Sequence, residues 1–201
     1  MKTKLIFVCA VCLLMVIPMV PAQIQKSQSQ PLQQESQHQT ISVSVSNPYE
    51  SFSYTQPPVP ITKDGNTVGY LSIEVGGSPG PEQNGGLFRT YMRWINIIAL
   101  DVNLVPVAWE RTFGIFSWVN YISCVILCPL VMSGSYRPLI WHRDGVSHTQ
   151  RDGMVLIAWL KGHADFRNNQ FESAYIESTV IVGYFGDTIF DFWYEGPGWL
   201  V

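Results

Sequence analysis

The sequence predicts an all-β fold, a single-domain β-sandwich or partly closed barrel. Segments with alternating apolar and polar residues recur along residues 41–201, beginning with 41–46, where Ile and Val alternate with Ser. Turn-forming residues such as Asp64-Gly65 separate these segments at short intervals. Both patterns are typical of antiparallel strands joined by tight turns. The β-patterned part is also long enough to form one domain with a substantial core.

The first 22 residues have the pattern of a secretory signal peptide. Lys2 and Lys4 precede an apolar segment, and Ala22 is a small residue at a suitable cleavage position. We therefore expect residues 1–22 to be removed and the protein to be secreted, extracellular or at the cell surface. Residues 23–40 are rich in Gln and Ser and hold too few apolar side chains for a packed core. We interpret them as a flexible spacer before the β-domain, residues 41–201.

The charge of the chain argues against one class of partner. The formal net charge is −3, and removal of Lys2 and Lys4 with the signal peptide makes it −5. The sequence has no basic run, and binding to nucleic acid needs clustered Lys and Arg to neutralise phosphates. We therefore expect no nucleic-acid partner, and association with a membrane is a lesser expectation.

The first half of the β-domain contains two clear strand signals. Residues 56–60 form a proline-rich crossing that cannot join the centre of a sheet, because proline lacks the backbone donor. Asp64-Gly65 predicts a tight hairpin turn, because these residues tolerate positive φ, and a strand over residues 67–75 follows. Residues 87–100 fit either a helical stripe or a strand. We interpret them as a strand because β-branched residues are frequent there and a glycine-rich turn precedes them.

The middle of the chain is ambiguous. Residues 102–109, broken by Pro106, predict an edge strand. Residues 113–132 contain no charge and are long enough for a membrane-spanning helix. They also fit two buried strands that turn near residues 119–120, which is the interpretation we favour. A membrane protein that spans through 113–132 is the alternative. Cys124 and Cys128 lie in this run, and we expect both to be buried thiols.

The last part of the chain predicts strands over residues 136–141 and 154–160, followed by turns at 163–165 and 168–169. A final hairpin is expected from residues 173–185 and 188–194. Between the first two strands lies a loop rich in His and Asp. Our candidate ligand-binding residues there are Trp141, which we expect to be accessible, and His142, Asp144, His148 and Asp152.

The same loop and the turn at residues 163–165 provide the best candidate for a metal site. Imidazole and carboxylate groups are typical ligands of divalent metals, and the candidate ligands are His142, His148, His163 and Asp165. No fixed metal-binding motif such as HExxH is present. Asp144 and Asp152 each precede a glycine, so solvated turns explain them as well.

The sequence contains no catalytic signature. It has neither a Gly-x-Ser-x-Gly motif nor a phosphate-binding loop that leads into a helix. We therefore expect a binding or assembly module without catalysis or cofactor, whose aromatic residues bind a glycan or another surface protein. The alternative is a metal-dependent hydrolase or metal-binding protein that holds a divalent metal through the His and Asp residues.

Overall fold

The computed structural model describes residues 25–26, 36–43, 50–80, 88–119, 123–151 and 156–199. These residues form β-strands in two antiparallel sheets, so the predicted all-β class is confirmed. Among them, no helix is long and apolar enough to cross a membrane. The predicted signal peptide, residues 1–22, lies outside the described residues.

The five-stranded sheet is a simple meander, in which each strand pairs with the next one along the chain. Its first turn is the predicted hairpin, where Asp64 and Gly65 have φ values of 50° and 77°. Such positive values are typical of a type I′ turn, so this prediction is confirmed. In sheet order, the strands are β3 (Phe52–Lys63), β4 (Asn66–Pro79), β5 (Phe88–Leu100), β6 (Pro106–Val119) and β7 (Ser123–Ser135).

The six-stranded sheet joins the two ends of the chain. Strands β8 to β11 form a second meander, and β11 pairs with β2 from the N-terminal part. The predicted final hairpin is confirmed as β10 and β11. In sheet order, the strands are β1 (Gln25–Lys26), β2 (Ser36–Val43), β11 (Thr188–Glu195), β10 (Ser173–Gly183), β9 (Ile157–Asn168) and β8 (Trp141–Arg151).

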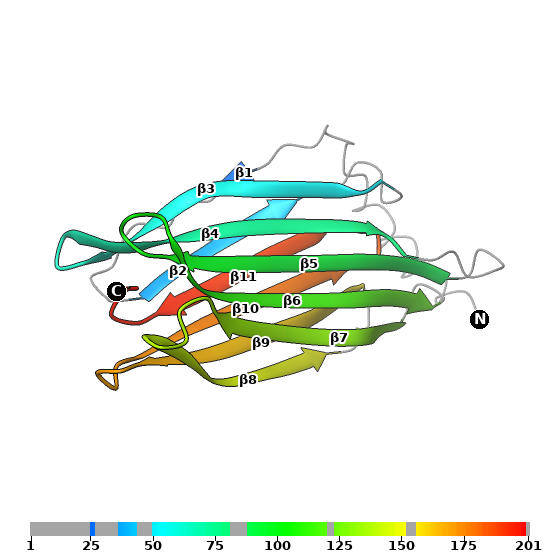
Figure 1. Cartoon of the computed structure of the whole chain (residues 1–201). Helices are drawn as coiled ribbons and strands as arrows, with labels where there is room; N and C mark the ends of the chain where they lie inside the picture. The colour runs from blue at the N-terminus through cyan, green and yellow to red at the C-terminus, as the bar shows by residue number, and fades with distance from the viewer. Residues whose placement is uncertain are drawn as a thin grey trace, which may run out of the picture.

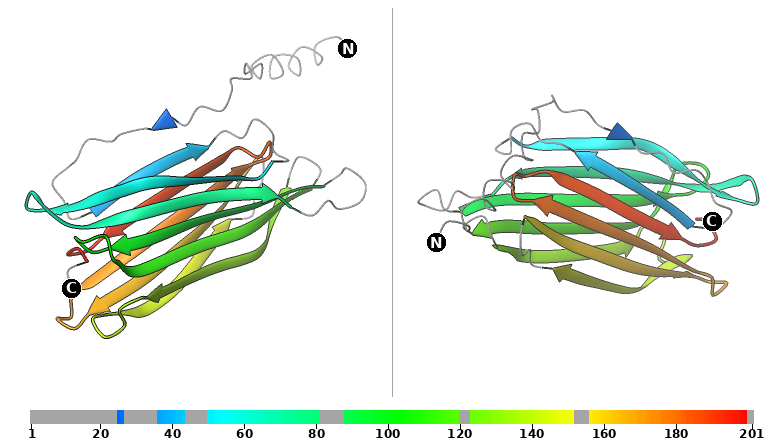
Figure 2. Two further views of the ribbon diagram at one scale, coloured as in Figure 1. Left: turned by 45° about the horizontal axis from the view of Figure 1, so that its top comes forward. Right: turned by 180° about the vertical axis from the view of Figure 1, so that it is seen from behind.

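The two sheets lie one behind the other as two layers, as the views in Figures 1 and 2 show. Side chains alternate along each strand between the space shared by the layers and the outside. The core between the sheets is aliphatic and aromatic, with fully buried members such as Ile73, Ile97, Phe116, Leu160 and Phe190. Burial of these faces is the main favourable term that holds the sheets together.

The apolar run 113–132 is divided between β6 and β7, which pair in an antiparallel hairpin. The predicted strand pair is therefore confirmed, and the single helix of the alternative interpretation is contradicted. Complete burial was the wrong expectation, because β7 is an edge strand. Its residues Val125, Leu127 and Leu130 are 40–44% exposed. Cys124 is buried as expected, whereas Cys128 is exposed, and both are free.

Three other predicted elements differ from the structure. Pro106 opens β6 and does not mark an edge strand, because the first residue of a strand can lack its donor. The predicted loop at residues 141–153 is largely the edge strand β8, while residues 137–140 before it form a turn. Residues 163–165 lie in the middle of β9. The exposed edge strand β8 carries polar residues on both faces, so it lacks the alternation by which strands are recognised.

Part of the predicted spacer, residues 23–40, belongs to strands, and residues 27–35 lie outside the described residues. Strand β2 begins at Ser36, inside the range 23–40, and pairs with β11 along its whole length. This pairing uses backbone groups, so it does not require the apolar side chains whose scarcity suggested a spacer.

Candidate functional site

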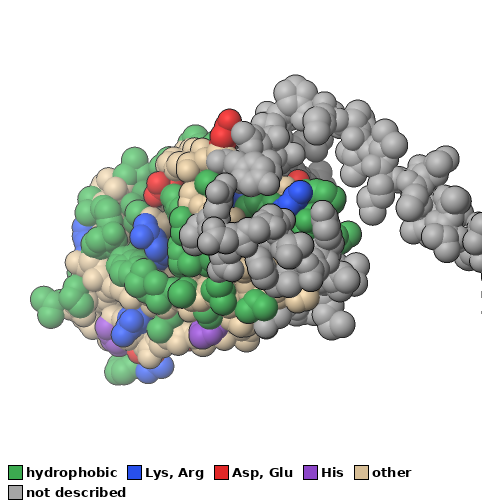
Figure 3. Space-filling view, turned by 90° about the vertical axis from the view of Figure 1, so that its right-hand side faces the viewer, with side chains coloured by type: hydrophobic (Ala, Val, Ile, Leu, Met, Phe, Trp, Pro, Cys, Tyr) green, Lys and Arg blue, Asp and Glu red, His purple; other side chains and the backbone are tan. Residues whose placement is uncertain are grey.

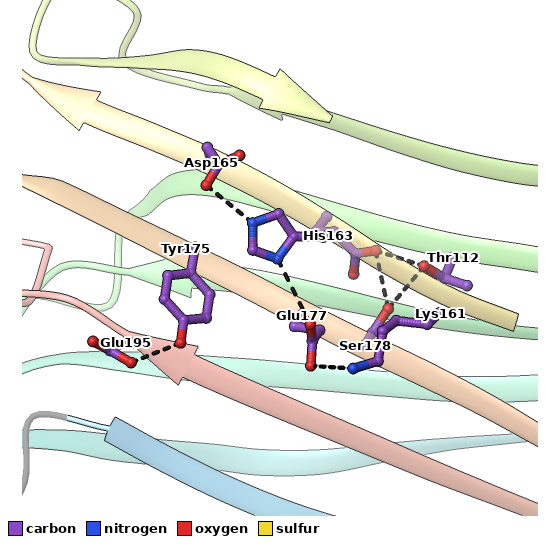
Figure 4. A network of polar contacts seen from close by, with 9 residues as sticks. Thr112, Lys161, His163, Asp165, Tyr175, Glu177, Ser178 and Glu195 are labelled. Carbon is purple, nitrogen blue, oxygen red and sulfur yellow. Dashed lines mark hydrogen bonds and ion pairs between the residues drawn. The ribbon is translucent and has the colours of Figure 1, made fainter. Parts of the chain in front are cut away.

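The outer face of the six-stranded sheet holds His163 and Asp165 in a network of polar contacts (Figure 4). His163 Nε2 lies 3.0 Å from Asp165 Oδ1, and its Nδ1 lies 3.8 Å from Glu177 Oε2 on β10. The other oxygen of Glu177 lies 2.8 Å from Lys161 Nζ. These side chains belong to neighbouring strands and point away from the core, and the sequence identified the first two of them.

Tyr175 extends this network toward β11. Its hydroxyl group donates a 2.6 Å hydrogen bond to Glu195 Oε2, and its ring lies 5.2 Å from that of His163. Partial burial and the Glu195 carboxylate raise the pKa of Tyr175 to about 12. Acidic and basic groups on this face thus contact one another, which is typical of a solvated sheet surface.

The other two candidate histidines, His142 and His148, do not join this network. His142 Nε2 is 3.7 Å from Asp144 Oδ1, and Asp144 Oδ2 is 2.8 Å from Arg167 Nη2. His142 pairs with Arg167, four residues along β9 from His163, which corresponds to about 13 Å at the rise of a strand. His148 pairs with Gly162 and therefore lies on the opposite face of the sheet from His163.

Of the four predicted metal ligands, the structure brings two together, His163 and Asp165. In the part of the chain that the structure describes, no group of three or more His, Cys, Asp or Glu side chains is arranged to hold a metal ion. His163 and Asp165 come together, whereas His142 and His148 do not join them. Asp152 lies outside the described residues.

Strand β8 begins at the end of the two layers where the β3–β4 and β9–β10 turns are found (Figure 1), and Trp141 is its first residue. The expectation that it is accessible is wrong, because it is 1% exposed and packs against Trp199 with 4.8 Å between ring centroids. It forms one wall of a cleft of about 690 Å³. The other residues that line the cleft are Lys63, Val68, Ile140, Asn168, Asn169, Gln170, Glu172, Pro197 and Gly198.

The opposite end of the molecule has a surface of mixed composition. Figure 3 views this end, where hydrophobic side chains are interspersed with basic, acidic and histidine side chains. Phe185 is 58% exposed in the turn between β10 and β11. Single exposed apolar residues of this kind are common on soluble proteins.

An apolar surface that the sequence did not identify covers part of the outer face of the five-stranded sheet. Cross-strand pairing aligns Trp94, Phe113 and Leu130 in one row across β5, β6 and β7. The next row consists of Met92, Ile115 and Leu127. We call this surface, with the adjoining residues of β7, the apolar face: Met92, Trp94, Phe113, Ile115, Val125, Leu127, Leu130 and Met132.

Glycines shape two tryptophan positions on this side of the sheet. A Cβ atom at Gly76 would clash with the Trp94 indole, and one at Gly134 would lie 2.8 Å from Trp109 Nε1. Each ring therefore lies close over the backbone of the neighbouring strand, where a larger side chain would displace it.

The polar part of the same sheet face contrasts with the apolar face. Strand β4 presents Ser72, Glu74 and Ser78 outward, beside the apolar rows of β5 to β7. On β6, the charged residue nearest in sequence to the apolar rows is Arg111. Its guanidinium group lies 5.9 Å from the Trp94 ring centroid. A concentrated apolar surface with a polar border is typical of an interaction site.

Comparison of the chain with protein-family models, curated proteins and solved structures finds no match. The candidate site therefore rests on the geometry of the molecule itself.

Proposed function

We propose that the protein is an exported β-sandwich that acts as an assembly module, and that its apolar face binds a second copy of the chain. The observation that supports this proposal is the pair of complete apolar rows across β5, β6 and β7. An outer sheet face in contact with water is normally polar. Val125, Leu127 and Leu130 are each at least 40% exposed, so a partner that covered them would remove apolar area from water.

The size of the apolar face favours reversible association. At the spacings of an antiparallel sheet, each same-face position occupies roughly 33 Å², so the eight residues of the apolar face cover roughly 260 Å². This exceeds an isolated exposed residue but is about a third of the roughly 800 Å² per partner of a standard interface. We therefore expect a dimer in which the polar border contributes the rest of the contact.

Self-association is also compatible with charge and symmetry. The eight residues of the apolar face include no acidic or basic side chain, and the exposed Arg111, the cross-strand neighbour of Met132, lies at its border. Two copies therefore meet there without repulsion between like charges when their Arg111 side chains are kept apart. Two sheet faces pack at about 10 Å, and a twofold axis allows each face to cover its equivalent. Addition of a strand at an edge of the five-stranded sheet is less favoured, because β3 carries prolines at 57, 58 and 60 and β7 carries Pro129.

Sedimentation velocity over a range of protein concentrations tests the proposal. We expect wild-type protein to shift from monomer to dimer with concentration, and Leu130→Glu to remain monomeric. Ile189→Glu is a matched control, because Ile189 is also exposed (39%, against 44% for Leu130) but lies on the outer face of the other sheet. A wild-type monomer at every concentration, or equal effects of both substitutions, would contradict the proposal.

The cleft beside Trp141 favours a second candidate function, the binding of a small polyhydroxylated ligand such as a sugar. Its volume lies in the range of ligand pockets, and its walls combine apolar side chains with amide and carboxylate groups. Asn168 Nδ2 donates a 2.7 Å hydrogen bond to Glu172 Oε2 and so orients this carboxylate at the cleft. Ligand-observed NMR with monosaccharides tests this candidate function, and we expect Glu172→Ala to weaken the binding signals that the wild type gives. Binding signals of equal strength in the wild type and in Glu172→Ala would contradict binding at the cleft.

A further inference from the structure

A carboxyl group is buried between the sheets, at the border of the apolar face and one residue along β6 from Arg111, the neighbour of Met132. Glu110 on β6 is fully buried, and its Oε1 lies 2.6 Å from Thr112 Oγ1 and 3.0 Å from Ser178 Oγ. The two hydroxyl oxygens are 2.8 Å apart, which closes a triangle of polar contacts (Figure 4). Within the described residues, Glu110 Oε2 has no hydrogen-bond partner. The triangle links β6 of one sheet to β10 of the other.

The neutral acid fits this triangle better than the carboxylate does. When Oε1 carries the proton, the three groups hold three hydrogens for three contacts, so each group donates once and accepts once. When the proton is lost, only the hydroxyl hydrogens of Thr112 and Ser178 remain. One of the three contacts then lacks a hydrogen, and a buried charge must be stabilised by two neutral donors.

No ion pair involves Glu110 among the described residues, and the inward-facing side chains of β9 and β10 opposite it are not ionisable. Burial raises the pKa of Glu110 to about 8, although its hydrogen bonds to Thr112 and Ser178 lower it in part. Arg143 donates to the carbonyl of Ser133, the cross-strand neighbour of Glu110. The ionisable groups that face inward from the surrounding described strands are Tyr54, Arg89, Tyr91, Arg93, Cys124, Arg143, His148 and Tyr194.

On the side that faces β9, the carboxyl group is closely packed. A Cβ atom at Gly162 on β9 would lie 2.5 Å from Glu110 Oε1 and 2.9 Å from the side chain of Val131. Hydration of a charged Glu110 from this side therefore requires β6 to move away from β9. Trp109 and Arg111, the chain neighbours of Glu110, point to the outer surface beside the apolar face and would move with it.

We propose that the proton on Glu110 controls assembly: its loss loosens β6 against the six-stranded sheet, distorts the apolar face and releases the partner copy. This inference rests on the proposed assembly through that face. It assigns to a buried side chain, remote from the partner, the regulation of the interface.

The direction of the pH effect follows from the linkage between protonation and folding. The pKa of Glu110 in the folded state lies above its ordinary value of 4.5, so the folded protein holds the proton more tightly than the unfolded chain. The stabilisation is complete below pH 4.5 and is lost as the pH rises through about 8. Within this window, the unfolding equilibrium constant rises by up to about tenfold per pH unit.

Sedimentation velocity at pH 6 and pH 9 provides the test, with wild type, Glu110→Gln and Glu195→Gln compared in a Cys128→Ser background. Glutamine keeps the shape of glutamate but cannot ionise, whereas Glu195 is an exposed acid on the outer face of the other sheet. The Cys128→Ser change removes an exposed thiol from β7. We expect wild type and Glu195→Gln to lose dimer at pH 9, and Glu110→Gln to retain the dimer fraction that it has at pH 6.

The possible failures are distinct. Wild-type dimer that persists unchanged at pH 9 would overturn the regulation and leave the proposed assembly intact, whereas a wild-type monomer at pH 6 would overturn both. A loss of dimer at pH 9 in Glu110→Gln equal to that in wild type would also contradict the role of Glu110. If Glu110→Gln does not fold, infrared spectroscopy of wild type gives the answer: a carbonyl band of a protonated carboxyl group must be present at pH 7 and absent at pH 10.

Discussion

Replacement of Gly162 by alanine tests how closely the two sheets approach at the Glu110 triangle. The added methyl group would clash with Thr112 Oγ1 and would lie 2.5 Å from Glu110 Oε1. These atoms have little freedom, because they hydrogen-bond to each other at 2.6 Å and to Ser178 at 2.8 and 3.0 Å. We therefore expect β9 to be displaced from β6 and the core contacts on both sides of Gly162 to be weakened.

The expected cost is about 3 kcal/mol in the free energy of unfolding, at the upper end of the range for overpacked cores, because a hydrogen-bonded group is displaced as well. For a domain of this size, such a loss lowers Tm by about 6–12 °C. Urea unfolding followed by tryptophan fluorescence, together with calorimetry, measures both quantities.

Gly183→Ala is the matched control for this substitution. Gly183 also lies in the six-stranded sheet, but the nearest atoms to its added Cβ would be 3.6 Å away, an ordinary van der Waals distance. We expect a change of no more than about 0.5–1 kcal/mol, in the stabilising direction, because alanine restricts the unfolded chain. If Gly162→Ala and Gly183→Ala have the same free energy of unfolding within about 0.5 kcal/mol, the close approach of β6 and β9 is refuted.

Three further substitutions or modifications test other parts of the structure. Arg93→Met should lower the free energy of unfolding by about 2–3 kcal/mol in urea titrations, because this fully buried guanidinium group donates to the Thr188 hydroxyl and to three carbonyl groups, of which, within the described residues, only that of Gly186 has a second side-chain donor, Thr188. Unchanged stability would contradict its linking role. In the folded protein, a thiol reagent should label the exposed Cys128 and spare the buried Cys124, and equal labelling of the two would contradict the orientation of β7. Glu195→Gln should lower the pKa of Tyr175 from about 12 part of the way toward its ordinary value of 10, as measured by ultraviolet titration of tyrosinate, and an unchanged titration would show that burial alone raises it.

The strands that the sequence predicted well are those with a strict alternation or a specific turn. Asp64-Gly65 identified the first hairpin, and the regular alternation after Ser173 identified the last one. The apolar run 113–132 was correctly divided into two strands, because Asn120 and the flanking serines interrupt it. Local patterns of this kind are carried by neighbouring residues, so a single sequence is sufficient to find them.

The candidate sites were harder to predict, because they depend on which face of which strand each residue occupies. His142, His148 and His163 are near one another in sequence but apart in the sheet. His148 lies on the opposite face from His163, because β8 has a bulge between Arg143 and Gly145. His142 pairs with β9 four residues away from His163. Trp141 was expected in a loop, but its contact with Trp199 buries it. Such outcomes follow from pairings over long sequence distances, which no local pattern contains.

The apolar face and the Glu110 triangle were missed for related reasons. An apolar residue on a strand suggests the core, and only the register of β5, β6 and β7 shows that Trp94, Phe113 and Leu130 share an outer face. The opposite holds for Glu110, because a glutamate flanked by Trp109 and Arg111 suggests a surface position. The available signal was the spacing: Glu110 and Thr112 lie in phase with the buried residues Phe116 and Trp118 of the same strand.

Hydroxyl-radical footprinting at low and high protein concentration tests most directly whether the outer surface of β5–β7 is an interface. Met92, Phe113 and Met132 provide reactive side chains on the apolar face, and the exposed Phe185 and Tyr136 provide reference positions away from it. Oxidation of the first three residues is predicted to fall as concentration rises, while that of the reference residues stays constant. If oxidation of Met92, Phe113 and Met132 is the same at both concentrations, the proposal that this face binds a second copy is contradicted.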